Sequence, residues 1–440
     1  MQPVLSFEQA PPISVPYRFF LTAPLFGAVA GLVLVLLGPE TLQSRWSHGA
    51  LAMTHLIVVD FMLQAMCGSL LQFVAVMAGA NIWRPQLVAA VVHPLIMAGA
   101  VLLAAAFLLE LPLLFVLAAL VFSTALGLFL SVMAVALLRT PARGMSIHIL
   151  RMAVLGLLIT VVLGATLALT LGLQRDVLQV SSLTALINVH VAWGLGGWAL
   201  MLVIGVSYLV VPMFQLTPAY PLWLTRVLPL SLLAVVCLWS LQVGAGGGEP
   251  QWWQSWVAAV GMLIIATYAA TTLWLQSRRR RRLVDVTFLF WRVAMTALIA
   301  YALSWVLFML WPGLGAEPRT ALWLGVLALP GVFLSVIMGM LYKIVPFLNW
   351  LHLQRIGDPR TPPPNMKQMI PEQWVRRQMW MHFAALGLLL TAVLWPPLAT
   401  LAGLLFAASC ALLEWNLVGA VRRYETFRAR ILAAAADRKS

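Results

Sequence analysis

Long apolar segments separated by short polar ones make up most of this chain. The segments run for about 20 residues or more without alternation of apolar and polar positions, which favours membrane-spanning helices over the strands of a barrel. The pattern predicts an all-α polytopic membrane protein of about twelve transmembrane helices. They are expected at residues 19–38, 50–79, 86–109, 112–138, 147–172, 183–214, 222–243, 254–276, 285–310, 320–348, 379–396 and 399–421.

A short phrase recurs at the ends of two apolar segments. GVSYLVVPMF begins at Gly205 and GMLYKIVPFL begins at Gly339, with glycine, tyrosine, valine and proline at matching places. A weaker copy, GSLLQFVAV, begins at Gly68. Such self-similarity predicts three tandem four-helix units, and repeats in membrane proteins commonly place function where the units meet. The expected units are approximately residues 17–140, 146–277 and 285–421.

Composition indicates that the bilayer is the solvent of this protein. Hydrophobic residues make up 62% of the chain and charged residues only 9%, whereas a soluble domain carries about 25% charged residues. The three cysteines, Cys67, Cys237 and Cys410, lie inside apolar segments, so no disulfide framework is indicated. The lipid bilayer is therefore the first expected partner.

The net charge of +14 is distributed as a topology signal. When the loops are assigned alternately to the two sides, every lysine and arginine except Arg45, Arg175 and Arg319 falls on one side. This positive-inside pattern predicts that the N- and C-termini are both cytoplasmic, together with a long loop at 349–377 and a basic tail at 422–440. The basic residues suit anionic lipid headgroups, and nucleic acid is not an expected partner.

Two histidines occupy related places in the first two units. His55 and His190 lie in the outer thirds of the second and sixth helices, shortly before Gly68 and Gly205; His382 lies nearer the cytoplasmic surface. A buried imidazole needs a hydrogen-bond partner or a metal, and a neutral imidazole suits haem iron or copper. Two interpretations stay open: ligands of a metal, or packing histidines bonded to neighbouring helices.

A carboxyl group is also expected inside the second helix. Asp60 lies within that helix, and Gln64 follows one turn later on the same face. An aspartate at such depth costs a few kcal/mol unless it is paired or protonated. Asp60 and Gln64 therefore indicate either a proton or ion relay or a buried hydrogen bond. Regular α-helical periodicity places Asp60 about 140° around the helix from His55.

Other sequence signals are weak or missing. Gly194, Gly196 and Gly197 crowd the sixth helix, where they could permit close helix approach or leave room for a flat macrocycle below His190. The sequence contains no Walker loop, HExxH, GxSxG, CxxC or CxxCH motif. Nucleotide hydrolysis, zinc hydrolysis and covalent c-type haem therefore have no support.

Several phrases together have a familiar pattern: RFFLTAPLFG from Arg18, THL from Thr54, GSLLQ from Gly68, the stretch from His190 to Tyr208, and KIVPFLNWLHL from Lys343. With the twelve-helix layout, they resemble subunit I of the haem-copper oxidases, and more closely its divergent subunit-I-like and NnrS-type relatives, which are linked to nitric oxide. The resemblance covers nearly the whole chain in layout. In the oxidases the second-helix histidine binds the low-spin haem and the sixth-helix histidine binds copper, and the resemblance implies these positions for His55 and His190.

This sequence departs from the oxidase pattern at the helices that complete the oxygen-reducing centre. The expected helices 222–243 and 320–348 contain no histidine, so the resemblance excludes oxygen or nitric-oxide reduction by the usual binuclear centre. It implies a non-enzymatic protein of a bacterial cytoplasmic (inner) membrane that binds b-type haem or copper at His55 and His190, serves respiratory, nitric-oxide or metal-stress physiology, and has a respiratory or redox partner. The alternatives are a secondary transporter using Asp60 and the repeat interface, or a metal-free assembly protein.

Overall fold

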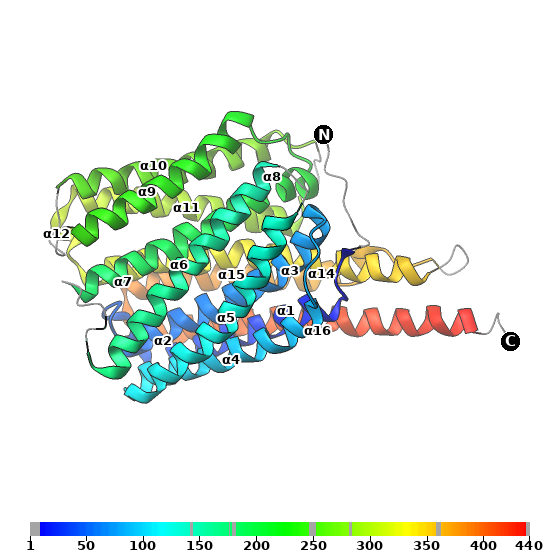
Figure 1. The fold of residues 1–440 in the computed structure, drawn as a ribbon, viewed down its shortest axis with the longest axis horizontal. Coiled ribbons are helices and arrows are strands. Elements are labelled where there is room, and N and C mark those ends of the chain that lie inside the picture. Colours follow the sequence, from blue (N-terminus) through cyan, green and yellow to red (C-terminus); the bar gives the residue numbers. More distant parts are fainter. Residues whose placement is uncertain are drawn as a thin grey trace.

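The computed structural model describes residues 9–140, 144–175, 177, 182–245, 252–280, 284–357 and 362–436, and these residues contain no β-strand. Within them, twelve helical spans are long and apolar enough to cross a membrane, which confirms the predicted fold class. The chain is a multi-pass membrane protein. The spans lie side by side with their axes running in broadly the same direction (Figure 1).

Nine of the spans contain an uninterrupted α-helix, and their observed bounds agree closely with the sequence predictions at most ends. They are α1 (Ser14–Leu37), α4 (Pro85–Leu109), α5 (Pro112–Arg139), α6 (Met145–Leu173), α9 (Leu222–Ala245), α10 (Trp252–Ser277), α11 (Val286–Leu310), α15 (Glu372–Leu394) and α16 (Ala399–Ala436). Short helical turns η2 (Gly38–Leu42), α12 (Pro312–Gly315), η6 (Met366–Gln368) and η7 (Pro396–Leu398) lie in the connections.

The second, sixth and tenth spans share a different construction, in which a π-helical segment joins two α-helices. They are α2 (His48–His55), η3 (Leu56–Leu63) and α3 (Gln64–Ala78); α7 (Leu183–Val191), η4 (Ala192–Leu200) and α8 (Met201–Gln215); and α13 (Pro318–Val326), η5 (Leu327–Leu334) and α14 (Ser335–Ile356). π-Helical segments are rare and frequently occur at functional sites.

Each π segment ends at a leucine five residues before the glycine of the repeated phrase: Leu63 before Gly68, Leu200 before Gly205 and Leu334 before Gly339. The sequence repeat thus coincides with a recurring irregularity of the backbone. The limits of the three units remain a prediction from the sequence.

Three helix ends in the last three spans differ from the predictions. The tenth span continues as α14 to Ile356 and α15 begins at Glu372, so the predicted loop 349–377 is helical at both of its ends. Buried Asn349 keeps α14 helical, because its amide donates to the carbonyl of Ala420 and its side-chain oxygen accepts from Tyr17. Likewise α16 continues to Ala436, so the predicted tail 422–440 is helical in its described part.

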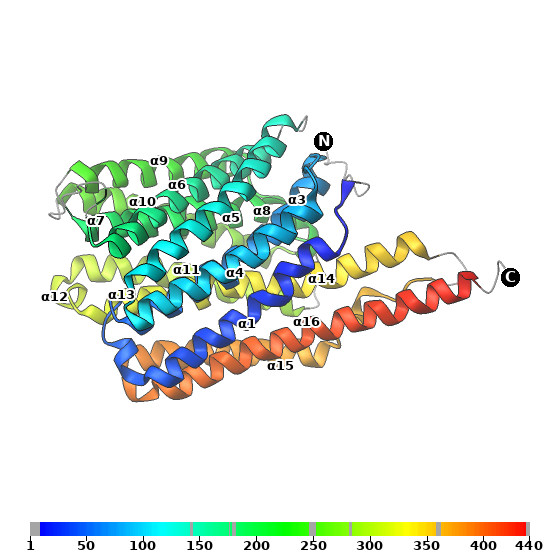
Figure 2. The same ribbon diagram turned by 60° about the horizontal axis from the view of Figure 1, so that its bottom comes forward.

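The ends of the described chain lie at the same end of the bundle. The start of α1 and the end of α16 lie on the same side of the molecule, and α1, α15 and α16 lie side by side (Figure 2). Close packing of α1 on α16 depends on glycine, since a Cβ atom on Gly31 would lie 2.7 Å from the carbonyl oxygen of Gly403. That this end faces the cytoplasm is a prediction from the basic residues.

A cavity of about 180 Å³ lies between α3, α8 and α14, directly beyond the π segments. Its walls are almost entirely apolar and use equivalent places within the repeated phrase and just before it. Sets of equivalent lining residues are Ala65, Leu202 and Val336; Met66, Val203 and Ile337; and Phe73, Val210 and Ile344. The three irregular spans therefore meet along the centre of the bundle.

Candidate functional site

His55 is the last residue of α2 and directly precedes the π segment η3. Its Nδ1 atom lies 2.8 Å from the carbonyl oxygen of Leu51, and its ring stacks on Phe107 of α4 with the ring centroids 5.1 Å apart. Because a carbonyl oxygen can only accept, Nδ1 carries the proton and Nε2 keeps its lone pair. Histidines that bind metals commonly have this arrangement, with the non-ligating nitrogen donating to a backbone carbonyl.

His190 lies near the end of α7, two residues before the π segment η4. Its ring packs on α6, where a Cβ atom on Gly164 would lie 2.9 Å from Cε1 of His190. Its Nδ1 atom is buried and has no hydrogen-bond partner. An unpaired buried nitrogen is costly, so its presence calls for a physical explanation such as a ligand.

His55 and His190 come from different predicted units. His55 stands one residue before the π segment η3, and His190 stands two residues before the π segment η4. Across the described residues, no group of three or more histidine, cysteine, aspartate or glutamate side chains could hold a metal ion. The candidate donors here are therefore limited to the two imidazoles, a residue type that serves as ligand to haem iron and to copper.

Part of the glycine-rich stretch of the sixth span is occupied by a neighbouring helix. A Cβ atom on Gly156 of α6 would lie 2.1 Å from the carbonyl oxygen of Gly197, so the two backbones are in direct contact there. The ring of Trp193 packs on the other side of Gly197. Gly197 therefore serves helix packing, and no room for a macrocycle is left at this glycine.

Asp60 lies in the π segment η3 and is fully buried. The amide of Gln64 donates to Oδ1 of Asp60 at 2.8 Å, as the spacing of the two residues suggested. Oδ2 of Asp60 has no hydrogen-bond partner. The predicted angle between Asp60 and His55 assumed α-helical periodicity, and in a π-helix residues five apart are hydrogen-bonding neighbours, so that angle does not apply here.

Sequence reasoning missed two members of this polar group. The hydroxyl of Thr22 on α1 donates to Oε1 of Gln64 at 2.8 Å, and Nε2 of His93 on α4 lies 2.8 Å from the same hydroxyl. The resulting chain runs from His93 through Thr22 and Gln64 to Asp60 and joins three spans. Sequence offered only the polar character of Thr22 and His93 inside apolar helices, with no sign that they face each other.

The tenth span carries a related polar contact at the corresponding place. Ser335 follows η5 as Gln64 follows η3, and its hydroxyl lies 2.9 Å from Nε2 of His382 on α15. His382 is fully buried among the spans. Because α15 begins at Glu372 rather than near residue 379, His382 lies about three turns inside the helix rather than close to its start.

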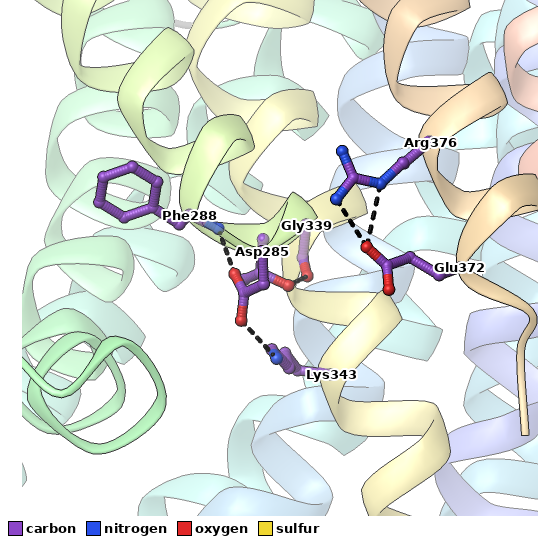
Figure 3. A network of polar contacts seen from close by, with 7 residues as sticks. Asp285, Phe288, Gly339, Lys343, Glu372 and Arg376 are labelled. Atoms are coloured by element: carbon purple, nitrogen blue, oxygen red, sulfur yellow. Dashed lines mark hydrogen bonds and ion pairs between the residues drawn. The ribbon is translucent and has the colours of Figure 1, made fainter. Parts of the chain in front are cut away.

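An ion pair joins the start of α11 to the repeated phrase in the middle of α14 (Figure 3). The carboxylate of Asp285 accepts from the backbone N–H of Phe288 at 2.9 Å and from Nζ of Lys343 at 2.8 Å, so it caps α11 and pairs with α14 at once. A further ion pair joins Glu372 and Arg376 within α15 at 2.6 Å. These contacts position helix ends and lie apart from the histidine pair.

The sequence matches no protein-family model and no curated protein.

Proposed function

We propose that this multi-pass membrane protein binds a b-type haem or a copper ion through His55 and His190. One observation carries the proposal: two imidazoles stand just before π segments, one with Nε2 free for ligation and the other with an unpaired buried Nδ1. In an apolar surrounding, a metal satisfies such nitrogens and offsets the cost of burying them. The resemblance to oxidase subunit I points to the same two residues.

The expected role is electron transfer or sensing rather than catalysis. A bound haem iron or copper supplies a one-electron couple. His55 would hold the metal through Nε2, because its Nδ1 donates to Leu51, and stacking on Phe107 would fix the plane of its ring. We place the protein in a bacterial cytoplasmic membrane, with a respiratory or redox partner, in respiratory, nitric-oxide or metal-stress physiology.

The visible spectrum of the purified protein tests this proposal. Protein expressed with a haem supply should show a Soret band, or copper by elemental analysis, and His55→Ala and His190→Ala should each abolish or shift the signal. The matched control is His148→Ala, since His148 is an exposed histidine near the start of α6. A wild-type preparation without colour and without copper would refute the proposal.

A second function, secondary transport, is favoured by one specific observation. Asp60 is a fully buried carboxyl group with an unpaired Oδ2, and the central cavity lies between spans of all three predicted units. A transporter of this kind would couple substrate movement to an ion at Asp60. It predicts ion-coupled flux in proteoliposomes that Asp60→Asn abolishes and that His55→Ala leaves intact, whereas a metal protein gives the opposite pattern.

A further inference from the structure

We propose that His93, Thr22, Gln64 and Asp60 form a proton-binding chain whose hydrogen bonds reverse direction when Asp60 binds a proton. The ligand of this site is the proton itself. The proposal does not depend on a metal at His55 and His190, and it extends the relay suggested by Asp60 and Gln64 to two residues on other spans.

The donors and acceptors of the chain allow only a few arrangements. Thr22 has one hydroxyl proton, and Oε1 of Gln64 at 2.8 Å competes for it with the carbonyl oxygen of Arg18 at 3.0 Å. When that proton goes to Gln64, the hydroxyl oxygen can only accept from His93. Nε2 of His93 must then carry a proton. Every hydrogen bond therefore points from His93 towards Asp60.

This direction suits an ionised Asp60. The carboxylate accepts from Nε2 of Gln64, whose Oε1 accepts from Thr22, and Thr22 accepts from His93. The chain delivers donors to a carboxylate that has no cationic partner among the described residues. The arrangement stabilises negative charge at Asp60 only as far as neutral dipoles can, so proton uptake remains an accessible alternative.

The opposite direction suits a protonated Asp60. The acid proton on Oδ1 needs an acceptor, and rotation of the Gln64 amide by half a turn supplies Oε1 at the same place. The amide N–H then faces Thr22 and donates to its oxygen, and the Thr22 hydroxyl donates to Nε2 of His93. His93 becomes an acceptor with its proton on Nδ1. No proton crosses the amide, so the chain couples the two ends without conducting between them.

Few charges compete with this coupling. The elements packed against η3 are α1, α2, α3, α4 and η5, and α5 packs on α4 beside His93. Their other titratable residues are Tyr17, Arg18, His48, His55, Cys67 and Arg139. Of these, Arg18 touches the chain through its backbone carbonyl oxygen, which lies 3.0 Å from the Thr22 hydroxyl.

Proton binding at Asp60 would change contacts among three spans. Thr22 belongs to α1, Gln64 to α3 and His93 to α4, and all their mutual hydrogen bonds change partner or direction together. Asp60 itself lies in a π segment, where the backbone departs from regular helix geometry. The site therefore links a proton to the packing of the first predicted unit.

Nuclear magnetic resonance of ¹⁵N-histidine, combined with infrared spectroscopy of carboxyl groups, tests this proposal on the purified full-length protein across a range of pH. In wild-type protein, the infrared band of protonated Asp60 and the donor or acceptor state of His93 Nε2 should change together. Asp60→Asn removes the group that binds the proton, so the donor or acceptor state of neutral His93 Nε2 should no longer change with pH. In Gln64→Leu, Asp60 and His93 should respond independently. His382 is the matched control, because it bonds to Ser335 outside the chain.

Three results would overturn the proposal: Asp60 keeps one protonation state throughout, Asp60 changes state while His93 does not, or Asp60→Asn leaves the response of His93 unchanged. If a variant fails to fold, the wild-type comparison of Asp60 with His93 decides alone. The proton-binding proposal predicts the same infrared and ¹⁵N signals in His55→Ala, whether or not haem or copper is lost. A failure of the metal proposal can therefore be told apart from a failure of this one.

Discussion

Replacing Thr22 by valine removes one hydroxyl from the polar chain while nearly preserving side-chain shape. Among the four residues of the polar chain, Thr22 alone contacts both Gln64 and His93. The change leaves Oε1 of fully buried Gln64 without its donor and leaves Nε2 of half-buried His93 without its partner. The prediction is a loss of stability, because the fully buried Gln64 has no water to replace the hydroxyl and His93 loses a hydrogen-bond partner.

The size of this loss follows from the two hydrogen bonds. Interhelical hydrogen bonds in membranes contribute about 0.6 kcal/mol on average, and an orphaned buried group costs about 1–3 kcal/mol. Because His93 is only half buried, it contributes less than Gln64. We expect Thr22→Val to lower the free energy of unfolding by about 1–2 kcal/mol.

Reversible denaturant unfolding in mixed micelles measures the effect, with Thr124→Val as the matched control. Thr124 lies on the outside of α5, and its hydroxyl donates only to the carbonyl of Leu120 in its own helix at 2.8 Å. Its replacement should change stability by less than about 0.5 kcal/mol. Equal effects of the two substitutions would show that Thr22 does not join the helices as described.

Three further predictions address packing and helix ends. Gly156→Ala should destabilise the protein by about 1–3 kcal/mol in the same assay, because its Cβ would lie 2.1 Å from the Gly197 carbonyl oxygen. The control Gly127→Ala, where no atom lies within 4 Å of the added Cβ, should be neutral or stabilising. A larger loss of stability in Gly127→Ala would contradict the packing of α6. Lys343→Met should lower the free energy of unfolding by about 0.5–1 kcal/mol, because the partly exposed Asp285 loses its ionic partner. The loss should shrink at high salt, and a salt-independent loss would contradict an ionic contribution. Ser335→Ala should lower the free energy of unfolding by about 1–2 kcal/mol, because Nε2 of His382 loses its hydrogen-bond partner. The control Ser131→Ala should lower it much less, because the Ser131 hydroxyl donates only to the carbonyl of Gly127 in its own helix. Equal losses would contradict a role for the histidine contact.

The twelve spans were predictable because the bilayer imposes a simple rule. Each span must be long, apolar and helical, and hydropathy alone reveals such segments. The π segments were not predictable, since LIVVDFML at Leu56–Leu63 reads as ordinary helix. The ends of α14 and α16 were also missed, because tertiary hydrogen bonds such as those of Asn349 keep polar residues helical beyond the apolar run.

The candidate site was predictable only where residues lie on one helix. The spacing of Asp60 and Gln64 indicated their hydrogen bond directly. Thr22 and His93 come from other spans, and helix orientation about its own axis depends on packing that a single sequence does not encode locally. The similar places of His55 and His190 in the repeat suggested a shared location. The tautomer of His55 and the unpaired Nδ1 of His190 depend on neighbouring helices and are seen only in the structure.

The most direct test of the histidine pair is the haem and copper content per chain of purified wild-type protein and of the double variant His55→Ala/His190→Ala, both shown to be folded. The account predicts close to one haem or one copper ion per wild-type chain and almost none in the double variant. Equal content in the two proteins, or no metal in either, would contradict it.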